Sequence, residues 1–186
     1  MRSTFLVLVV VPSLVAAGPE GSPPPLNKAV LEYARSRLGE TVGDGQCTSL
    51  AVEALGQAGA RRFPFAESGD YVWGRPVESF AEALPGDVLQ FRDAVFVGTV
   101  TLSGGRTMTY RQNYPHHTAI VAEVREGGRL VTVLHQNVAD AGVKPSEIQT
   151  VREGTIRPPW LQKGGRVWIY RPTIPDDSVL KRRPRP

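Results

Sequence analysis

The sequence predicts an α+β domain in which two helices precede an antiparallel sheet. Two observations favour this class. Both helical patterns of apolar residues lie in the first third of the chain, and a series of strand patterns separated by Gly-rich turns follows them. At 186 residues the chain is long enough for a single domain with a buried core, and it contains no internal repeat.

Each predicted helix has its own start signal. The first covers residues 27–38, where Asn27 is the expected N-cap and Gly39 the expected end. The second begins at Cys47, directly after the turn Gly43-Asp44-Gly45, and continues to residue 58. Both helices carry an apolar stripe and are therefore expected to pack on the sheet.

Strand patterns occupy most of the second half of the domain. A hairpin is expected at Ser103-Gly104-Gly105, and a further turn at Glu126-Gly127-Gly128. Residues 61–84 form a loop-rich stretch with several aromatic side chains, among them Trp73, which either lines a cleft or belongs to the core. The predicted strands are residues 88–91, 96–102, 106–110, 117–124, 130–136, 148–152 and 166–170.

Four segments make up the predicted domain organisation. Residues 1–17 have the charged start, apolar stretch and small-residue cleavage site of a secretory signal peptide, and residues 18–25 form a Gly/Pro/Ser-rich linker. The folded domain is expected over residues 26–172, followed by a basic Pro-rich tail at 173–186. The apolar stretch is short and contains Pro12, so no stable membrane span is expected after signal cleavage. The protein is therefore expected to be secreted, or to lie in the periplasm or cell envelope.

The positive charge of the chain is concentrated at its ends. The formal net charge is +4, but Arg2 lies in the signal and four basic residues lie in the tail. Without these five, 17 basic residues face 18 acidic ones, so the domain itself is close to neutral. The tail is either a solvated end or a contact for an anionic polymer or membrane. No nucleic-acid-binding motif occurs, so nucleic acid is not an expected partner.

The chain has one cysteine, Cys47, and an intrachain disulfide is therefore excluded. Exported domains usually use cysteines in pairs, so this thiol is buried and inert, joined to another chain, or chemically active. Its place at a helix start favours chemistry, because the free N–H groups of a first helical turn stabilise a thiolate. Gln46, directly before it, carries an amide that can donate a hydrogen bond to a developing oxyanion.

A thiol nucleophile needs a base, and the chain offers three histidines, His116, His117 and His135. His117 is the expected base because it opens an apolar strand, so that His116 points the other way. If the turn at 126–128 is a three-residue connection, or an equivalent bulge occurs, His117 falls opposite Asn137 and His135 lies on the same face. Asn137, or else His135, would then orient the ring of His117 as the third member of a triad.

Each of these residues also has a structural interpretation. A lone cysteine at a helix start can pack in the core, a pair of histidines can be surface polarity, and Asn137 can start a turn. A metal site formed by Cys47 and the histidines is a further alternative, but the close Cys/His spacing of ordinary zinc sites is missing. No metal and no cofactor are therefore predicted, and the order and spacing of the residues favour catalysis.

Four short motifs in this order resemble the papain-like amidase and endopeptidase domains known as CHAP and NlpC/P60. They are Gly45-Gln46-Cys47-Thr48, Pro85-Gly86-Asp87-Val88, His117-Thr118-Ala119-Ile120-Val121 and His135-Gln136-Asn137. The resemblance covers about residues 26–172. It implies a papain-like fold, with the nucleophile helix packed on an antiparallel β-sheet, and a Cys-His-Asn triad that acts on peptide or peptidoglycan-like amide bonds.

A second resemblance is to the cysteine-proteinase-fold domain of fungal actin-patch proteins that bind myosin, which also has bacterial relatives. The motifs that carry it are Tyr71-Val72-Trp73-Gly74, His116-His117-Thr118-Ala119-Ile120-Val121, His135-Gln136-Asn137-Val138 and Val167-Trp168-Ile169-Tyr170-Arg171-Pro172. This resemblance implies the same fold but no established reaction.

The sequence therefore predicts a thiol-dependent amide or peptide hydrolase. Cys47 attacks a carbonyl, His117 moves the proton, and Gln46 with the N–H of Cys47 holds the oxyanion. The alternative is a papain-like fold kept as a binding module. It is favoured by Ser49, where CHAP domains usually have Trp, and by His135, where they often have Glu. Acyl transfer in place of hydrolysis would use the same residues.

Overall fold

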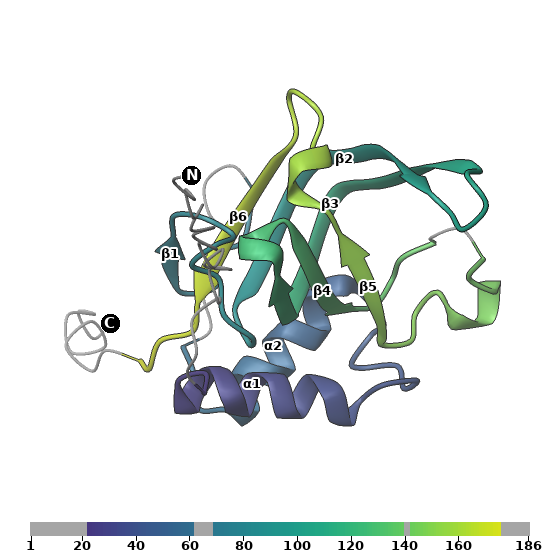
Figure 1. Cartoon of the computed structure of the whole chain (residues 1–186). Coiled ribbons are helices and arrows are strands. Elements are labelled where there is room, and N and C mark those ends of the chain that lie inside the picture. The colour runs from purple at the N-terminus through teal and green to yellow at the C-terminus, as the bar shows by residue number, and fades with distance from the viewer. Residues whose placement is uncertain (1–21, 62–68, 140–141, 176–186) are drawn as a thin grey trace, which may run out of the picture.

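The computed structural model describes residues 22–61, 69–139 and 142–175, which form two α-helices and one six-stranded sheet (Figure 1). The helices come first, α1 (Pro25–Ser36) and α2 (Cys47–Gln57). The strands are β1 (Arg75–Val77), β2 (Val88–Thr101), β3 (Thr107–Arg125), β4 (Leu130–His135), β5 (Arg152–Ile156) and β6 (Arg166–Arg171). Short 3-10 turns lie in the connections, η1 (Glu126–Gly128), η2 (Pro145–Glu147) and η3 (Pro158–Trp160). The α+β prediction is confirmed.

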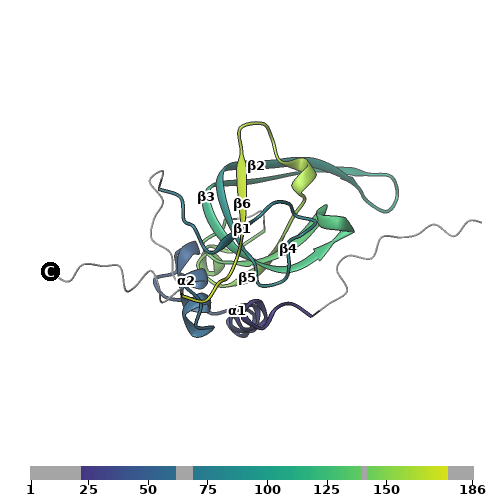
Figure 2. The ribbon, with the colours of Figure 1, turned by 90° about the vertical axis from the view of Figure 1, so that its left-hand side faces the viewer.

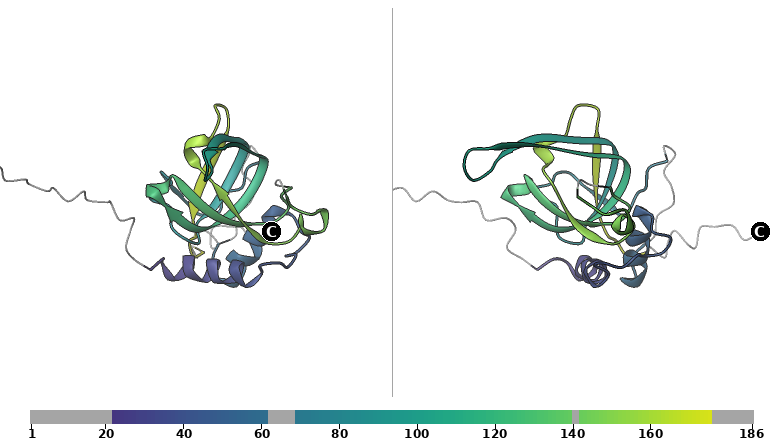
Figure 3. Two further views of the ribbon diagram at one scale, coloured as in Figure 1. Left: turned by 45° about the vertical axis from the view of Figure 1, so that its right-hand side comes forward. Right: turned by 90° about the vertical axis from the view of Figure 1, so that its right-hand side faces the viewer.

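The sheet is antiparallel, with the strand order β1-β6-β2-β3-β4-β5. Both helices lie on one side of it, below the strands in two perpendicular views (Figure 1, Figure 2). β2 and β3 continue beyond the other strands as a two-stranded ribbon that projects from the body of the domain (Figure 3). The helices thus cover one face of the sheet, while the ribbon extends past its end.

The sheet is buried on both faces, and each face has its own apolar cluster. On the helix side, Leu50 and Leu55 of α2 pack with Ile120 of β3. On the other face, which the curved sheet encloses, Phe91 and Val133 belong to a second cluster. Each fully buried aliphatic side chain contributes about 1.5–3 kcal/mol, so burial on both faces is the main source of rigidity for the strands that carry the histidines.

The start of α1 differs from the prediction. Asn27, the predicted N-cap, lies inside the helix and is only 1% exposed. Pro24 precedes the helix and Pro25 begins it, because the fixed φ of proline suits a first helical position. The Nδ2 atom of Asn27 instead donates to Oδ1 of Asp87 over 2.7 Å, and Arg171 binds the same carboxylate through two nitrogens. This buried network ties α1 to the turn before β2 and to β6. Pro25 therefore belongs to the domain and not to the predicted linker.

The long hairpin replaces four shorter predicted strands. β2 and β3 each merge two of them, because the ladder keeps one register on both sides of Asp93 and Pro115. Asp and Pro are both poor strand residues, so the sequence predicts interruptions there that neighbouring pairs override. The turn at Ser103-Gly104-Gly105 is confirmed, since Thr101 pairs with Thr107 across it.

The register between β3 and β4 is reached through a bulge. The connection after Arg125 has four residues where the prediction has three, because Arg125 pairs with Leu130. A register shift between Val121 and Glu123 compensates by one residue, and the pairing beyond it is the predicted one. The bulge was the stated alternative to a three-residue connection, and it has the same effect on the pairing of the two strands.

Two other parts of the strand prediction are wrong. The strand predicted at 148–152 is β5, which begins only at Arg152, and Val151 forms no more than an isolated bridge with Leu38. β1 was predicted as loop, because a three-residue strand has no alternation to detect. α1 ends at Ser36, two residues before its predicted end.

The predicted signal peptide, most of the linker and the basic end of the tail lie outside the described residues. Within the part of the chain that the structure describes, no helix is long and apolar enough to cross a membrane.

Candidate active site

The second helix begins at Cys47, as predicted, after a tightly wound loop. Gly43 has a φ of 58°, in the left-handed region that favours glycine. A Cβ at Gly43 would lie 2.9 Å from the Cβ of Ser49, so the loop has no room for a side chain there. The carboxylate of Asp44 accepts hydrogen bonds from the backbone N–H of Gln46 and the hydroxyl of Ser49. Asp44 therefore satisfies the helix start, which the side chain of Gln46 does not cap.

Gln136 fixes the same loop from the opposite side. Its side chain is fully buried at the end of β4. Its Oε1 accepts from the N–H of Val42 over 3.1 Å, and its Nε2 donates to the carbonyl oxygens of Val42 and Gln46 over 2.8 and 2.7 Å. The residue before the thiol is thus held by the strand that carries His135. Sequence analysis misses this role, because the type of a residue does not say which backbone groups it will meet.

Asn137 binds Gln46 and not His117. Its backbone has a φ of 59°, and its Nδ2 donates to Oε1 of Gln46 over 2.9 Å. Because the carbonyl oxygen of the Gln46 amide is turned towards Asn137, the NH2 group of that amide remains available as a donor. This is the group that the sequence analysis assigns to the oxyanion, so Asn137 orients it.

His135 is the side chain that meets His117. Nε2 of His117 lies 3.3 Å from Nδ1 of His135, and the two rings are 4% and 1% exposed. The ring of His117 also stacks on Tyr114, with ring centroids 5.1 Å apart. Of the two predicted candidates for the third member of the triad, the structure brings His135 to the base.

Burial decides the charge of both rings. It lowers the pKa of His117 well below its ordinary 6.5, and repulsion by His135, Arg152 and His116 acts in the same direction. The pKa of His135 is lowered to about 3, again first by burial and then by Arg152. Both imidazoles are therefore neutral at neutral pH, and the bond between them joins one N–H to one lone pair.

Burial also raises the pKa of the Cys47 thiol, and the Asp44 carboxylate adds to this rise. The backbone N–H groups of Thr118, Thr48 and Cys47 itself act in the opposite direction, as expected for a helix start, but burial is the larger effect. The resting form is therefore the thiol and not the expected thiolate. Among the described residues, no hydrogen bond joins the sulfur to either ring nitrogen of His117.

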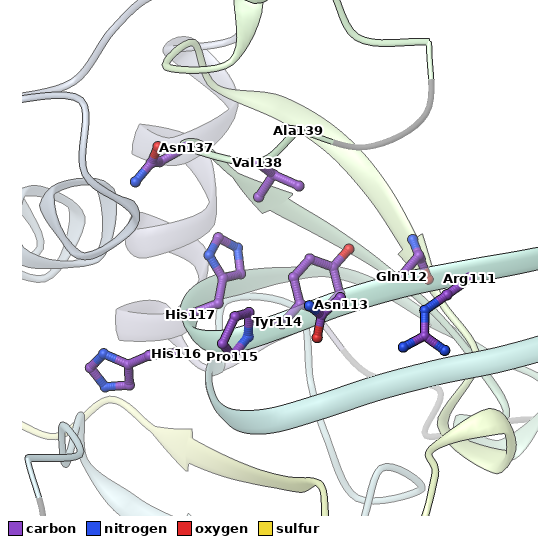
Figure 4. A pocket seen from close by; sticks show the side chains of 10 residues that line it. All are labelled: Arg111, Gln112, Asn113, Tyr114, Pro115, His116, His117, Asn137, Val138 and Ala139. Carbon is purple, nitrogen blue, oxygen red and sulfur yellow. The ribbon is translucent and has the colours of Figure 1, made fainter.

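A hollow of about 370 Å³ opens beside His117 (Figure 4). The neighbouring rings of His116 and His117 diverge there, and the ring of His117 is turned towards Asn137. Because Asn137 holds Gln46, the hollow connects the base with the loop that carries the thiol.

The other side of the sheet gives His116 and Trp73 different surroundings. Nε2 of His116 lies 3.6 Å from Oδ1 of Asp70, and its ring stacks on Tyr71 with centroids 5.8 Å apart. Trp73 is 1% exposed and donates from Nε1 to Oε1 of Gln90 over 3.1 Å. Of its two predicted places, Trp73 therefore occupies the core.

The side chains gathered at this site are a thiol, two imidazoles and two amides. A thiol with an imidazole can act as nucleophile and base, and an amide donor beside the thiol can bind an oxyanion. In the described ranges, no group of three or more His, Cys, Asp or Glu side chains is placed to hold a metal ion.

Comparison with known proteins relates this arrangement to a family. The sequence model of the AIM3/BBC1 cysteine proteinase-fold domain matches residues 26–180, which is most of the chain and includes every residue of the site. The match confirms the second resemblance found among the motifs. Searches of the curated proteins and of the solved structures found no match.

Proposed function

The chain belongs to the AIM3/BBC1 cysteine proteinase-fold domain family, and from this premise we propose that it is a thiol-dependent hydrolase of amide or peptide bonds. The thiol of Cys47 is the nucleophile, and His117 is the base. His135 orients the base, while Gln46 and the N–H of Cys47 bind the oxyanion.

The reaction begins with the attack of the Cys47 sulfur on a carbonyl carbon. The thiol proton passes to Nδ1 of His117 as the S–C bond forms, and the carbonyl oxygen takes up the negative charge near the Gln46 amide. His117 then returns the proton to the leaving amine, the C–N bond breaks, and a thioester remains. Water gives a proton to His117 and attacks the thioester, which releases the acid and restores the thiol.

The contact between His117 and His135 is the observation that carries this proposal. When Nε2–H of His117 donates to Nδ1 of His135, 3.3 Å away, the lone pair of His117 lies on Nδ1 and can accept the thiol proton. Because burial lowers the pKa of His117, the ring is ready as a base throughout the neutral range. A neutral thiol suits this scheme, since its proton then leaves during the attack and not before it.

The substrate follows from the sequence motifs. We propose a CHAP or NlpC/P60 type of papain-like fold, export by the signal at residues 1–17, and an envelope amide such as that of peptidoglycan as the substrate. Acyl transfer to an amine in place of water needs the same residues, and product analysis separates the two reactions.

The test is to incubate the purified chain with soluble peptidoglycan fragments and with a mixture of short peptides, and to identify products by mass spectrometry. We expect new amino termini with the wild type and none with Cys47→Ala or His117→Ala. His116→Ala is the matched control, because its ring diverges from the hollow, and it should keep the activity. Cleavage at the wild-type rate by His117→Ala would remove the proposed base.

A binding module without catalysis is the second candidate. It is favoured by the buried, neutral thiol and by the lack of a hydrogen bond from Cys47 to His117 within the described residues. Alkylation of Cys47 by iodoacetamide across pH distinguishes the two functions. Equal rates in the wild type and in His117→Ala, together with fragment binding that Cys47→Ala retains, would support the binding module. Faster alkylation of the wild type near pH 7 would support catalysis.

A further inference from the structure

A second hollow adjoins the one beside His117. It has a volume of about 440 Å³ and lies between the β2–β3 ribbon and the segment that joins β5 to η3. Arg111 and Gln112 line both hollows, and Figure 4 shows these two side chains at the end of the first hollow that is remote from Asn137. The two hollows therefore form one groove, which leads away from the candidate active site.

The groove is positively charged at its far end. Arg111 and Arg157 both line the second hollow, and none of the described residues that line either hollow is an Asp or Glu. Within the described part of the chain, neither arginine forms an ion pair. Two guanidinium groups that face one groove without a carboxylate partner are suited to an anionic ligand.

Arg157 is held in place from below. Its guanidinium lies over the ring of Trp160, 5.1 Å from the centroid. That ring rests on the backbone of Gly98, where a Cβ would lie only 2.0 Å from the indole. Gln112 closes the edge of the groove by donating from Nε2 to the carbonyl oxygen of Thr155 over 3.0 Å. The charge is therefore presented by a prearranged stack and not by a freely moving side chain.

We propose that this groove, referred to here as the arginine groove (Arg111, Arg157 and Trp160), binds a carboxylate on the peptide that enters the active site. The inference rests on the proposed function for the identity of the ligand as a peptide. A planar guanidinium binds a carboxylate through two parallel hydrogen bonds, and the aromatic side chains of Trp160 and Tyr110 can cover the peptide backbone beside it. The arginine groove thus selects acidic peptide chains over neutral ones of the same length.

Binding of two labelled peptides to the full chain with Cys47→Ala tests this proposal without any need for hydrolysis. The probes are a fluorescein-labelled peptide Ala-Ala-Glu-Ala-Glu and its counterpart with Gln in place of Glu, measured by fluorescence anisotropy at physiological ionic strength. We expect the Glu peptide to bind about tenfold more tightly than the Gln peptide, which corresponds to one or two charge-assisted hydrogen bonds. The double variant Arg111→Ala with Arg157→Ala should abolish this preference.

The control is the double variant Arg75→Ala with Arg166→Ala, which removes two exposed arginines from β1 and β6. It should keep the preference for the Glu peptide. Equal binding of both peptides, or an equal loss in the control, would overturn the proposal. Displacement of the peptide by inorganic phosphate as readily as by glutarate would show a general anion site and overturn the assignment to a carboxylate. Acidic binding without any cleavage by the wild type would leave the arginine groove standing and contradict only the proposed hydrolysis.

Discussion

Nε2 of His117 and Nδ1 of His135 face each other across 3.3 Å inside the sheet. The far nitrogen of His135, Nε2, is buried and has no hydrogen-bond partner among the described residues. It rests against Gly154, where a Cβ would lie 2.6 Å from it. The position of this second ring is therefore set by packing on one side and by His117 on the other, which makes His135 a positioning residue.

The first prediction concerns that role. His135→Ala should lower kcat on a peptide that the wild type cleaves by about a hundredfold and leave KM unchanged, because the base loses the acceptor that fixes its tautomer. His135→Asn should restore part of kcat, since an amide oxygen can accept the same N–H. Steady-state kinetics of the two variants provide the measurement. Equal kcat for the Ala and Asn variants would contradict an orienting role.

The second prediction is a loss of stability in acid. The folded-state pKa values of His117 and His135 lie below 6.5, so the stabilising contribution is complete above pH 6.5. As the pH falls below 6.5, the unfolded chain takes up protons first, and stability declines until the folded-state pKa, about 3 for His135. The slope should reach about 1.4 kcal/mol per pH unit for each histidine. Urea unfolding at several pH values measures it.

Two variants separate this effect from general acid denaturation. His135→Gln removes one buried ring and should make the slope shallower between pH 6.5 and about 3. His116→Gln removes an exposed ring and should leave the slope as it is. A wild-type stability that stays constant through this interval would be inconsistent with neutral, buried rings.

The third prediction treats Gln46 and Asn137 as one unit. Gln46→Ala should lower kcat by about 10²–10³, the usual effect of losing an oxyanion donor. Asn137→Ala should lower kcat less, because the Gln46 amide stays present but loses the hydrogen bond that orients it. The double variant should be no worse than Gln46→Ala alone. Kinetics of the four proteins test this coupling.

Asn113→Ala is the matched control for this cycle, since Asn113 lines the same hollow as an exposed side chain. Its kcat should stay close to that of the wild type. Strictly additive effects of the Gln46 and Asn137 substitutions would mean that the two amides act separately.

The fourth prediction concerns the buried carboxylate that joins α1 to β6. Asp87 is fully buried and bound by Arg171, whose side chain is 15% exposed. Asp87→Ala should cost about 3–5 kcal/mol of unfolding free energy, because it leaves Arg171 buried without its partner. Lys28→Ala removes one side of an exposed pair with Glu32 and should change stability by less than about 1 kcal/mol. Urea unfolding compares the two, and a similar cost for both would show that the Asp87 pair is not needed.

The amino-acid sequence by itself determined the parts of this protein that depend on local pattern. The apolar periodicity of residues 47–58 predicts a helix that starts at Cys47, and α2 starts there. The alternation around His117 predicts a strand, and the register with β4 follows from it once a bulge is allowed. Periodicity is a property of near neighbours in the chain, so it can be recognised without knowing the tertiary structure.

Only the tertiary structure decided which polar groups meet. β4 ends at His135, and the left-handed backbone of Asn137 carries its amide to Gln46, so His135 and not Asn137 is the partner of His117. Burial likewise set the neutral state of the Cys47 thiol and of both rings, against the expectation from the helix start alone. Solvent exposure and contacts between distant segments arise only when the chain is packed, and these are the quantities that determine hydrogen-bond partners and pKa values.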